Sequence, residues 1–296
     1  MNVFQEGDIA MKLSILPVSL FPELTGGRMT IASWASFAQQ AGADGYDASV
    51  LFFPSTTATT VLTIKRQLQE QDLSIPPVML CSYPDFTHPD ELERERQIDY
   101  FRRDIALASA FGFPYIRMTA GQAHPGLSID EGVRSAASCI ERVIDTAEKY
   151  HVKLCLENHA KPGAWPKTDF TFRPEAFIEL FRIVKDMPVG INFDTGNAMA
   201  CGADPVQLLE TVIDRVWTVH LNDTSTVGSL TPVLVGTGLV DFDAIFGYLK
   251  RHGFDGWVCI EEASGRGLRG ISEAITFARK YGPASRKNAP AGRFGQ

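Results

Sequence analysis

Cysteine is scarce in this chain, and its arrangement excludes two kinds of stabilised fold. The 296 residues include five cysteines, an odd number, and they are widely scattered with no Cys-x-x-Cys pair. A disulfide framework or a structural zinc site requires paired or closely spaced cysteines. The pattern therefore indicates a reducing compartment, and we expect a cytoplasmic protein whose cysteines, such as Cys155 and Cys259, are buried side chains within apolar strands.

Long hydrophobic runs and excess positive charge are also lacking. No segment approaches the ~20 apolar residues of a membrane-spanning helix, and the acidic N-terminus does not resemble a cleaved signal peptide. Lys and Arg number 28 against 35 Asp and Glu, a net charge of -7 at pH 7. This balance opposes attraction to nucleic acid or to an anionic membrane. We expect neither as a partner, and we expect instead a small-molecule substrate and a homo-oligomeric protein.

The chain alternates short β-rich runs with longer amphipathic runs from one end to the other. Eight strands are predicted at 12–20, 44–50, 76–82, 114–120, 152–158, 189–195, 216–222 and 256–262. Helical periodicity lies between them, for example over 90–112, 128–151 and 241–253. Eight such units in this length predict a (β/α)8 TIM barrel. A doubly wound open sheet is the alternative, but the first strand is not followed by Gly-x-Gly-x-x-Gly.

The domain organisation follows from the same pattern. No low-complexity linker interrupts the alternation, so we predict a single barrel domain over residues 1–296. The first ten residues precede a second methionine, Met11, and residues 283–296 are polar and rich in Gly, Pro and Ala. We expect both ends, 1–10 and 283–296, to be loose terminal extensions.

Four consecutive predicted strands end in a carboxylate or an imidazole. These residues are Glu157, Asp194, His220 and the pair Glu261-Glu262. One such residue alone is more often a helix N-cap or a structural histidine, but in a parallel barrel all four strand ends surround one opening. Converging carboxylates repel unless a cation lies between them. Oxygen donors with one imidazole suit Mn²⁺ first, with Mg²⁺, Co²⁺ or Zn²⁺ as alternatives, so one divalent metal is predicted.

These motifs carry a family resemblance. "CLENH", "INFDTGN", "VHLNDT" and "WVCIEE" resemble, in order and spacing, the xylose isomerase-like TIM-barrel superfamily and its sugar phosphate isomerase/epimerase family. The resemblance implies that the metal ligands are Glu157, Asp194, His220 and Glu261. It selects Glu261 over Glu262, whose side chain should point to the opposite face of the strand. By the same alternation the Asn158 side chain should point away from the barrel opening. We therefore expect it to make a structural hydrogen bond.

The predicted chemistry is proton transfer between adjacent carbons. Isomerising or epimerising a sugar or keto-sugar, free or as a phosphate or acid, needs a base, an acid and stabilisation of the enediolate, which a metal supplies. The resemblance implies that Glu157 and Glu261 are the catalytic pair. A lyase or dehydratase acting on a keto-sugar or inosose-like compound is the alternative. An abasic-site endonuclease is less favoured, because it needs further His ligands and the chain has six His in all.

Other polar residues near the strand ends are candidates for substrate binding. They share positions at the expected opening: His159, Arg117, Asn197, Trp165 and Lys161. His159 could instead anchor a loop, Arg117 could form a structural ion pair, and Trp165 and Lys161 could be exposed loop residues. Asn197 stands where many relatives carry a His, which argues against several metals. Arg266 and Arg269, at a predicted helix start, are either an anion site or a solvated loop.

Overall fold

The barrel predicted from the sequence is present in the computed structural model, which describes residues 11–163 and 165–281. The predicted terminal extensions, 1–10 and 283–296, lie outside the described residues. All ladder pairs are parallel, and the strand order is β1-β8-β7-β6-β5-β4-β3-β2. The strands are β1 Lys12–Leu16, β2 Tyr46–Ser49, β3 Pro77–Cys81, β4 Tyr115–Met118, β5 Lys153–Glu157, β6 Val189–Asp194, β7 Val216–Leu221 and β8 Trp257–Glu261.

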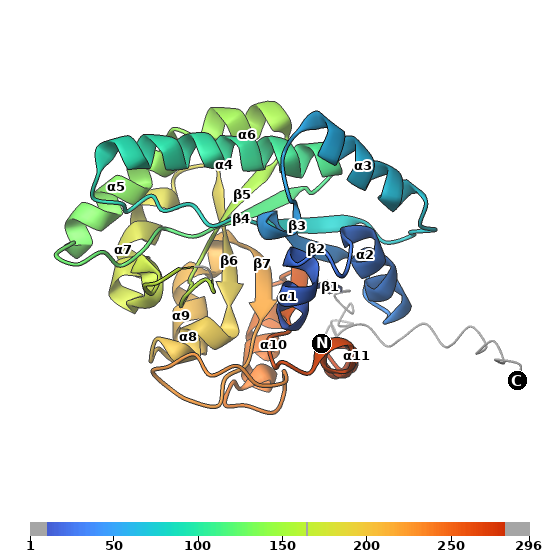
Figure 1. The fold of residues 1–296 in the computed structure, drawn as a ribbon. Coiled ribbons are helices and arrows are strands. Elements are labelled where there is room, and N and C mark those ends of the chain that lie inside the picture. The colour runs from blue at the N-terminus through green and yellow to red at the C-terminus, as the bar shows by residue number, and fades with distance from the viewer. Residues whose placement is uncertain (1–10, 164, 282–296) are drawn as a thin grey trace, which may run out of the picture.

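Helices surround the strands, as Figure 1 shows. The α-helices are α1 Phe21–Thr25, α2 Ile31–Gln40, α3 Ala58–Gln69, α4 Glu91–Phe111, α5 Ile129–Glu141, α6 Ile144–Tyr150, α7 Pro174–Val184, α8 Thr195–Ala200, α9 Pro205–Val212, α10 Phe242–Arg251 and α11 Gly267–Ala278. Short 3₁₀ turns are η1 Val18–Leu20, η2 Val50–Phe52, η3 Phe170–Phe172 and η4 Ile213–Arg215. The pattern over 128–151, which reads as one helix, is two helices separated by a turn.

The strands are apolar because helices cover them on one side and the barrel interior lies on the other. All six residues of β6 are buried, and a single large core cluster runs from Met11 to Ala278. A side-chain cap fixes the start of several helices; at α5, for example, Ser128 and Glu131 form a capping box. No helix in the described part of the chain is long and apolar enough to cross a membrane.

The barrel has one seam, between β1 and β2, where no strand ladder forms. Local contacts replace it: the Asp44 and Gly45 N–H groups donate to the Leu13 carbonyl at 2.8 and 3.1 Å, and Leu13 N–H donates to Asp44 Oδ2 at 2.8 Å. Arg279, just after α11, pairs with the Asp44 carboxylate at 2.8 Å. The seam is therefore closed by side chains from both ends of the described chain.

Candidate functional site

Four side chains from adjacent strands meet at the carboxyl end of the barrel. They are the four predicted from the strand ends: Glu157, Asp194, His220 and Glu261. One nitrogen or oxygen of each lies within 4.8 Å of the others. His220 Nδ1 is 2.8 Å from Glu157 Oε1 and 2.9 Å from Glu261 Oε2. Residues far apart in sequence thus form one compact acid-imidazole cluster, which we call the acid cluster.

The acid cluster is held in water-poor surroundings, so its charges interact strongly. Although burial alone would raise the pKa of Glu157, the charges of Arg117 and His220 lower it to about 2. Burial, together with Glu261 and Glu157, raises the pKa of Asp194 well above its ordinary value. Burial lowers the pKa of His220, but Cys259 and Glu157 more than reverse this and raise it well above the usual range. The cluster therefore retains protons to limit repulsion among its carboxylates.

The donor set fits a divalent cation. Glu157 Oε2 and Asp194 Oδ2 are buried and have no hydrogen-bond partner among the described residues, although buried polar atoms in proteins are almost always paired. A cation bound between three carboxylates and an imidazole would pair these oxygens and remove the repulsion that raises the pKa of Asp194. Oxygen-rich sites with one nitrogen suit hard or borderline ions.

Backbone contacts hold Asp194 in place. Its Oδ1 accepts from Asn197 N–H at 2.6 Å, which makes it the N-cap of α8, so Oδ2 is the oxygen directed elsewhere. Asn158 braces the same residue from β5: its side chain donates to the Asp194 carbonyl and accepts from the Asp194 N–H, both at 2.8 Å. Asn158 thus makes the structural hydrogen bond that strand alternation predicts, and its partner is the backbone of a site residue.

Glu157 accepts a hydrogen bond on Oε1, whereas Oε2 accepts none and lies beside the Arg117 guanidinium. Arg117 Nε is 3.2 Å from Oε2, and Asn192 Nδ2 donates to Oε1 at 2.7 Å. Arg117 also donates to the Ser82 carbonyl at 3.2 Å, and its guanidinium lies 4.7 Å from the Tyr83 ring centre. Of the two roles considered for Arg117, the structure therefore shows a buried ion pair with Glu157.

His159 lies beside this pair, as its position two residues after Glu157 predicts. Its Nε2 is 3.6 Å from Glu157 Oε2, and burial lowers the pKa of the ring to about 4. The imidazole is therefore neutral at pH 7. Its Nδ1 is buried without a partner among the described residues, so it is free to hydrogen-bond a substrate hydroxyl.

The remaining substrate-binding candidates divide into two groups. Asn197 is buried in α8, and neither atom of its amide has a partner in the described part of the chain. Lys161 is exposed and Trp165 is half-buried. A cavity of about 410 Å³ at the barrel opening is lined instead by Phe21, Pro22, Thr25, Leu51, Tyr83, Pro162 and Gly163. The loop after β5 reaches this cavity through Pro162 and Gly163, and Lys161 and Trp165 are not among its lining residues.

The residues after β8 point away from the acid cluster. Glu262 faces the helix layer, as alternation predicts: its Oε1 accepts from Ser264 N–H at 3.0 Å. Arg266 and Arg269 are exposed, and both pair with Glu273 at 2.7 Å. Exposed ion pairs of this kind contribute little to the stability of the fold. The two arginines therefore match the solvated-loop interpretation.

Three buried polar residues near the site were not found from the sequence. Asn192 positions Glu157 and is itself held by Thr218, whose Oγ1 donates to Asn192 Oδ1 at 2.8 Å. Asp47 and Cys259 lie next to His220, deeper in the barrel. A carboxylate in the middle of a predicted strand, as at Asp47, is the sequence signal that would have drawn attention to it.

Asp169 provides a first prediction, because burial raises the pKa of its carboxyl to about 8. This raised pKa means that the stabilising neutral form is fully present below pH 4 and is lost as pH rises through 8. In the wild-type protein the Thr171 N–H donates to Asp169 Oδ1 at 2.7 Å. Asp169→Asn keeps an oxygen that can accept this hydrogen bond, and it removes the ionisable carboxyl group. We expect the free energy of unfolding in urea to rise by on the order of 2 kcal/mol at pH 8 and to change little at pH 4.

The matched control for Asp169→Asn is Asp204→Asn. Asp204 also caps a helix, α9, by accepting from Val206 and Gln207 N–H groups, but on the surface, where Asn and Asp are equivalent caps. We expect its unfolding free energy to change by under ~0.5 kcal/mol at both pH values. An equal gain in the two variants, or a gain for Asp169→Asn that does not depend on pH, would contradict the prediction.

A nearly closed parallel barrel with polar residues at the carboxyl ends of its strands defines the class of TIM-barrel proteins with a site at the strand ends. Within this class, the chain belongs to the xylose isomerase-like TIM barrel family, whose model matches residues 35–281. The family resemblance inferred from the strand-end motifs is therefore confirmed.

The curated relatives include an isomerase and a dehydratase of inosose and an endonuclease. The inosose isomerase of Halalkalibacterium halodurans is 25% identical over 195 residues, which is 63% of this chain and 66% of that protein. The inosose dehydratase of Lacticaseibacillus casei is 22% identical over 173 residues, 53% of this chain and 55% of that protein. The probable endonuclease 4 of Natronomonas pharaonis is 30% identical over 148 residues, 46% and 50% of the two chains. The alignments thus span roughly half to two thirds of these relatives.

Solved structures show the same fold. The IolI protein, solved with a bound zinc atom, superposes with a TM-score of 0.73 at 21% identity, covering 92% of this chain and 98% of that one. At this identity the match establishes the architecture, and the function has to be argued from the site.

Proposed function

We propose that this protein is a divalent-metal-dependent isomerase or epimerase of a sugar or keto-sugar. The observation that carries the proposal is the acid cluster, in which Glu157 and Glu261 approach one imidazole nitrogen to 2.8 and 2.9 Å from strands on either side. Two carboxylates so placed can face opposite sides of one substrate carbon. The names of the curated relatives, an isomerase and a dehydratase of inosose, support the same substrate class.

In this proposal the ligands are Glu157, Asp194, His220 and Glu261, with Mn²⁺ the favoured ion. When bound, the ion would act as a Lewis acid toward the carbonyl and hydroxyl oxygens of the substrate. The zinc bound by the IolI protein supports a divalent metal here without selecting manganese. The one-metal site also agrees with Asn197, whose amide stands where a further His would be needed.

The side chains of the chain supply the proton transfers. One of Glu157 and Glu261 removes a proton from the carbon next to the carbonyl, and the other returns one. Return from the opposite face gives epimerisation, and return to the adjacent carbon gives isomerisation. Arg117 holds Glu157 ionised and oriented, His159 offers a neutral ring to a substrate hydroxyl, and Asn197 offers an unpaired amide.

A lyase or dehydratase is the second candidate. The carbanion formed by proton removal can expel a β-hydroxyl group instead of being reprotonated, so the same residues suffice for both reactions. The dehydratase among the curated relatives favours this alternative. Release of water from an inosose-like substrate would distinguish elimination from isomerisation.

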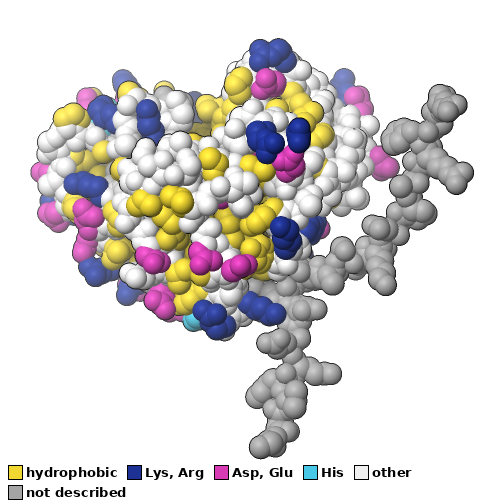
Figure 2. Space-filling model, turned by 90° about the horizontal axis from the view of Figure 1, so that it is seen from below, with side chains coloured by type: hydrophobic (Ala, Val, Ile, Leu, Met, Phe, Trp, Pro, Cys, Tyr) yellow, Lys and Arg dark blue, Asp and Glu magenta, His cyan; other side chains and the backbone are white. Residues whose placement is uncertain are grey.

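A nuclease is disfavoured despite the match to an endonuclease 4. The net charge of -7 opposes binding to a phosphate backbone. Figure 2 views the molecule from the side to which the β6 and β7 arrows point in Figure 1, and it shows acidic and basic side chains intermixed with apolar ones. We further propose a cytoplasmic, homo-oligomeric protein, supported for location by five free cysteines; light scattering against the 32.5 kDa chain mass tests the assembly.

A proton-exchange screen tests the proposed reaction. The protein with Mn²⁺ in D₂O is incubated with ketoses, keto-sugar acids and inosose-like compounds, and deuterium incorporation is followed by NMR. We expect deuterium at the carbon adjacent to the carbonyl of at least one compound, and this would identify both the substrate and the labile position. If the metal-loaded protein incorporates deuterium into no compound of these classes, the proposed chemistry is refuted.

Metal binding should release protons. The pKa values of Asp194 and His220 are raised in the metal-free protein, so a metal has to compete with protons for both side chains. We expect one ion per chain by elemental analysis and an affinity that falls about tenfold per pH unit for each displaced proton. Calorimetry in two buffers of different ionisation enthalpy measures the released protons. Binding without any proton release would contradict the prediction.

A further inference from the structure

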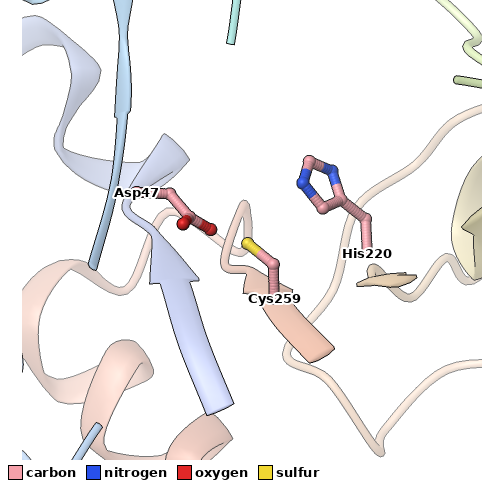
Figure 3. Close-up of side chains that lie close together, drawn as sticks. All are labelled: Asp47, His220 and Cys259. Atoms are coloured by element: carbon pink, nitrogen blue, oxygen red, sulfur yellow. The ribbon is translucent and has the colours of Figure 1, made fainter. Parts of the chain in front are cut away.

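Below the acid cluster, three buried side chains converge inside the barrel. Asp47 comes from β2, Cys259 from β8 and His220 from β7, and each is at most 1% exposed. One nitrogen, sulfur or oxygen of each lies within 4.8 Å of the others. Figure 3 shows the Asp47 carboxylate directed toward the Cys259 sulfur and one ring nitrogen of His220 facing both.

The two nitrogens of His220 have different surroundings. Nδ1 is the one near Glu157 and Glu261, so the nitrogen that faces Asp47 and Cys259 is Nε2. This Nε2 is buried and has no well-aligned hydrogen bond within the described residues. A histidine that offers its Nδ1 lone pair carries its proton on Nε2. That N–H requires an acceptor, because an unmade buried hydrogen bond costs about 1–3 kcal/mol.

Asp47 is fixed firmly enough to act as an anchor. Its Oδ2 accepts from Ser14 Oγ at 2.9 Å, and its Oδ1 accepts from Met79 N–H at 2.9 Å. The second contact exists because the β2–β3 register shifts between Tyr46 and Ala48, which leaves the Met79 N–H to a side chain. The carboxylate thus links β1, β2 and β3 in the barrel interior.

Cys259 lies where it can connect this anchor to the imidazole. The sulfur lies within 4.8 Å of a carboxylate oxygen of Asp47 and a ring nitrogen of His220, and the Cys259 side chain is buried at 1% exposure. An S–H group can donate to a carboxylate while its sulfur accepts from an N–H.

We propose that Cys259 and Asp47 are positioning residues for His220: the Nε2–H donates to the Cys259 sulfur, and the Cys259 S–H donates to Asp47. This arrangement keeps Nδ1 facing Glu157 and Glu261, so that its lone pair becomes available to a metal when the Nδ1 proton is displaced. Histidine ligands in metal sites commonly donate their second N–H to an anchored group, and loss of that group typically weakens binding about 10- to 100-fold. The inference rests on the proposed metal site and adds two residues to it.

Cobalt binding to the full chain tests this inference. Co²⁺ is titrated into metal-free wild type, Cys259→Ala, Cys259→Ser and Asp47→Asn, and the visible absorption bands report affinity and geometry. We expect Cys259→Ala and Asp47→Asn to weaken Co²⁺ binding roughly 10- to 100-fold and to alter the band shape. Cys259→Ser, which keeps a donor and an acceptor, should stay within about threefold of wild type.

The control is Cys139→Ala, which removes another buried thiol, on α5, far from the acid cluster and bonded only to the Phe86 carbonyl at 3.8 Å. Cys139→Ala and Cys259→Ala should both lower the free energy of unfolding measured in urea. Only Cys259→Ala should weaken Co²⁺ binding. Wild-type affinity in Cys259→Ala, or equal losses in Cys259→Ser and Cys259→Ala, would overturn the inference. A thiolate-to-cobalt charge-transfer band or a second bound ion would also overturn it, by making Cys259 a ligand. Failure of wild type to bind Co²⁺ would instead refute the metal site on which the proposed function depends.

Discussion

Glu157→Gln and Glu261→Gln are each expected to reduce deuterium exchange into substrate by about 10³-fold or more. Each change removes a proton-transfer group, whose contribution is typically 10²- to 10⁴-fold, and also a carboxylate from the metal site. Both residues lie within 2.9 Å of His220 Nδ1, so neither role can be taken over by a neighbour without rearrangement. The exchange rate at saturating Mn²⁺ measures the catalytic part of the loss, and elemental analysis measures the metal part.

Glu262→Gln is the matched control, because it makes the same substitution one residue later. Glu262 is buried, but it faces the helix layer, and its Oε1 accepts from Ser264 N–H at 3.0 Å, a contact that glutamine can keep. We expect exchange within about twofold of wild type. If Glu157→Gln and Glu261→Gln retain full turnover, or if Glu262→Gln is equally impaired, the two carboxylates are not the catalytic pair.

Arg117→Met should produce the largest loss of stability. Arg117 and Glu157 form an ion pair whose side chains are 2% and 0% exposed, and removal of one partner leaves a buried charge without compensation. Such changes typically cost about 3–5 kcal/mol. Urea unfolding of the metal-free protein at pH 7 measures this cost. Added Mn²⁺ should restore part of it, because the ion would neutralise Glu157.

The pH dependence of this loss has a definite sign. The pKa of Glu157 is lowered to about 2 in the folded protein. The contribution of the ion pair to the free energy of unfolding is therefore fully present above the ordinary glutamate pKa, and it is lost as pH falls toward 2. The difference between wild type and Arg117→Met should therefore narrow below pH 4.5. Arg142→Met, which breaks the exposed pair with Glu95, is the control and should cost under ~1 kcal/mol. Equal losses in the two variants would contradict a buried, stabilising pair.

The sequence predicted the barrel and the acid cluster because both follow from periodic features. Parallel strands covered on both faces are apolar throughout, so Glu157, Asp194 and Glu261 stand out where each strand ends. The closed sheet then brings these ends together without further information. Family motifs added the choice of Glu261 over Glu262, which the structure matches by turning the two side chains to opposite faces.

The supporting residues could not be predicted, because they depend on register and on three-dimensional contact. Asp47 reaches the Met79 N–H only through the shift between β2 and β3, which no local pattern encodes. Asn192 contacts Glu157 across two neighbouring strands at 2.7 Å. The loop after β5 is a different case: Pro162 and Gly163 line the opening cavity, and the substrate-binding role of Lys161 and Trp165 stays a prediction.

The seam between β1 and β2 has a consequence for how the chain matures during synthesis. Its closure depends on Arg279, which bonds Asp44 across 235 residues of sequence, and on β8, which is the ladder partner of β1. Strands emerge from the ribosome in order, and early units can pair as they appear. The first strand, however, has no ladder partner until nearly the whole chain has been translated. Circularisation of the sheet therefore requires β8, and a nascent chain that folds as it emerges and stalls before residue 257 would expose both edges of an open sheet.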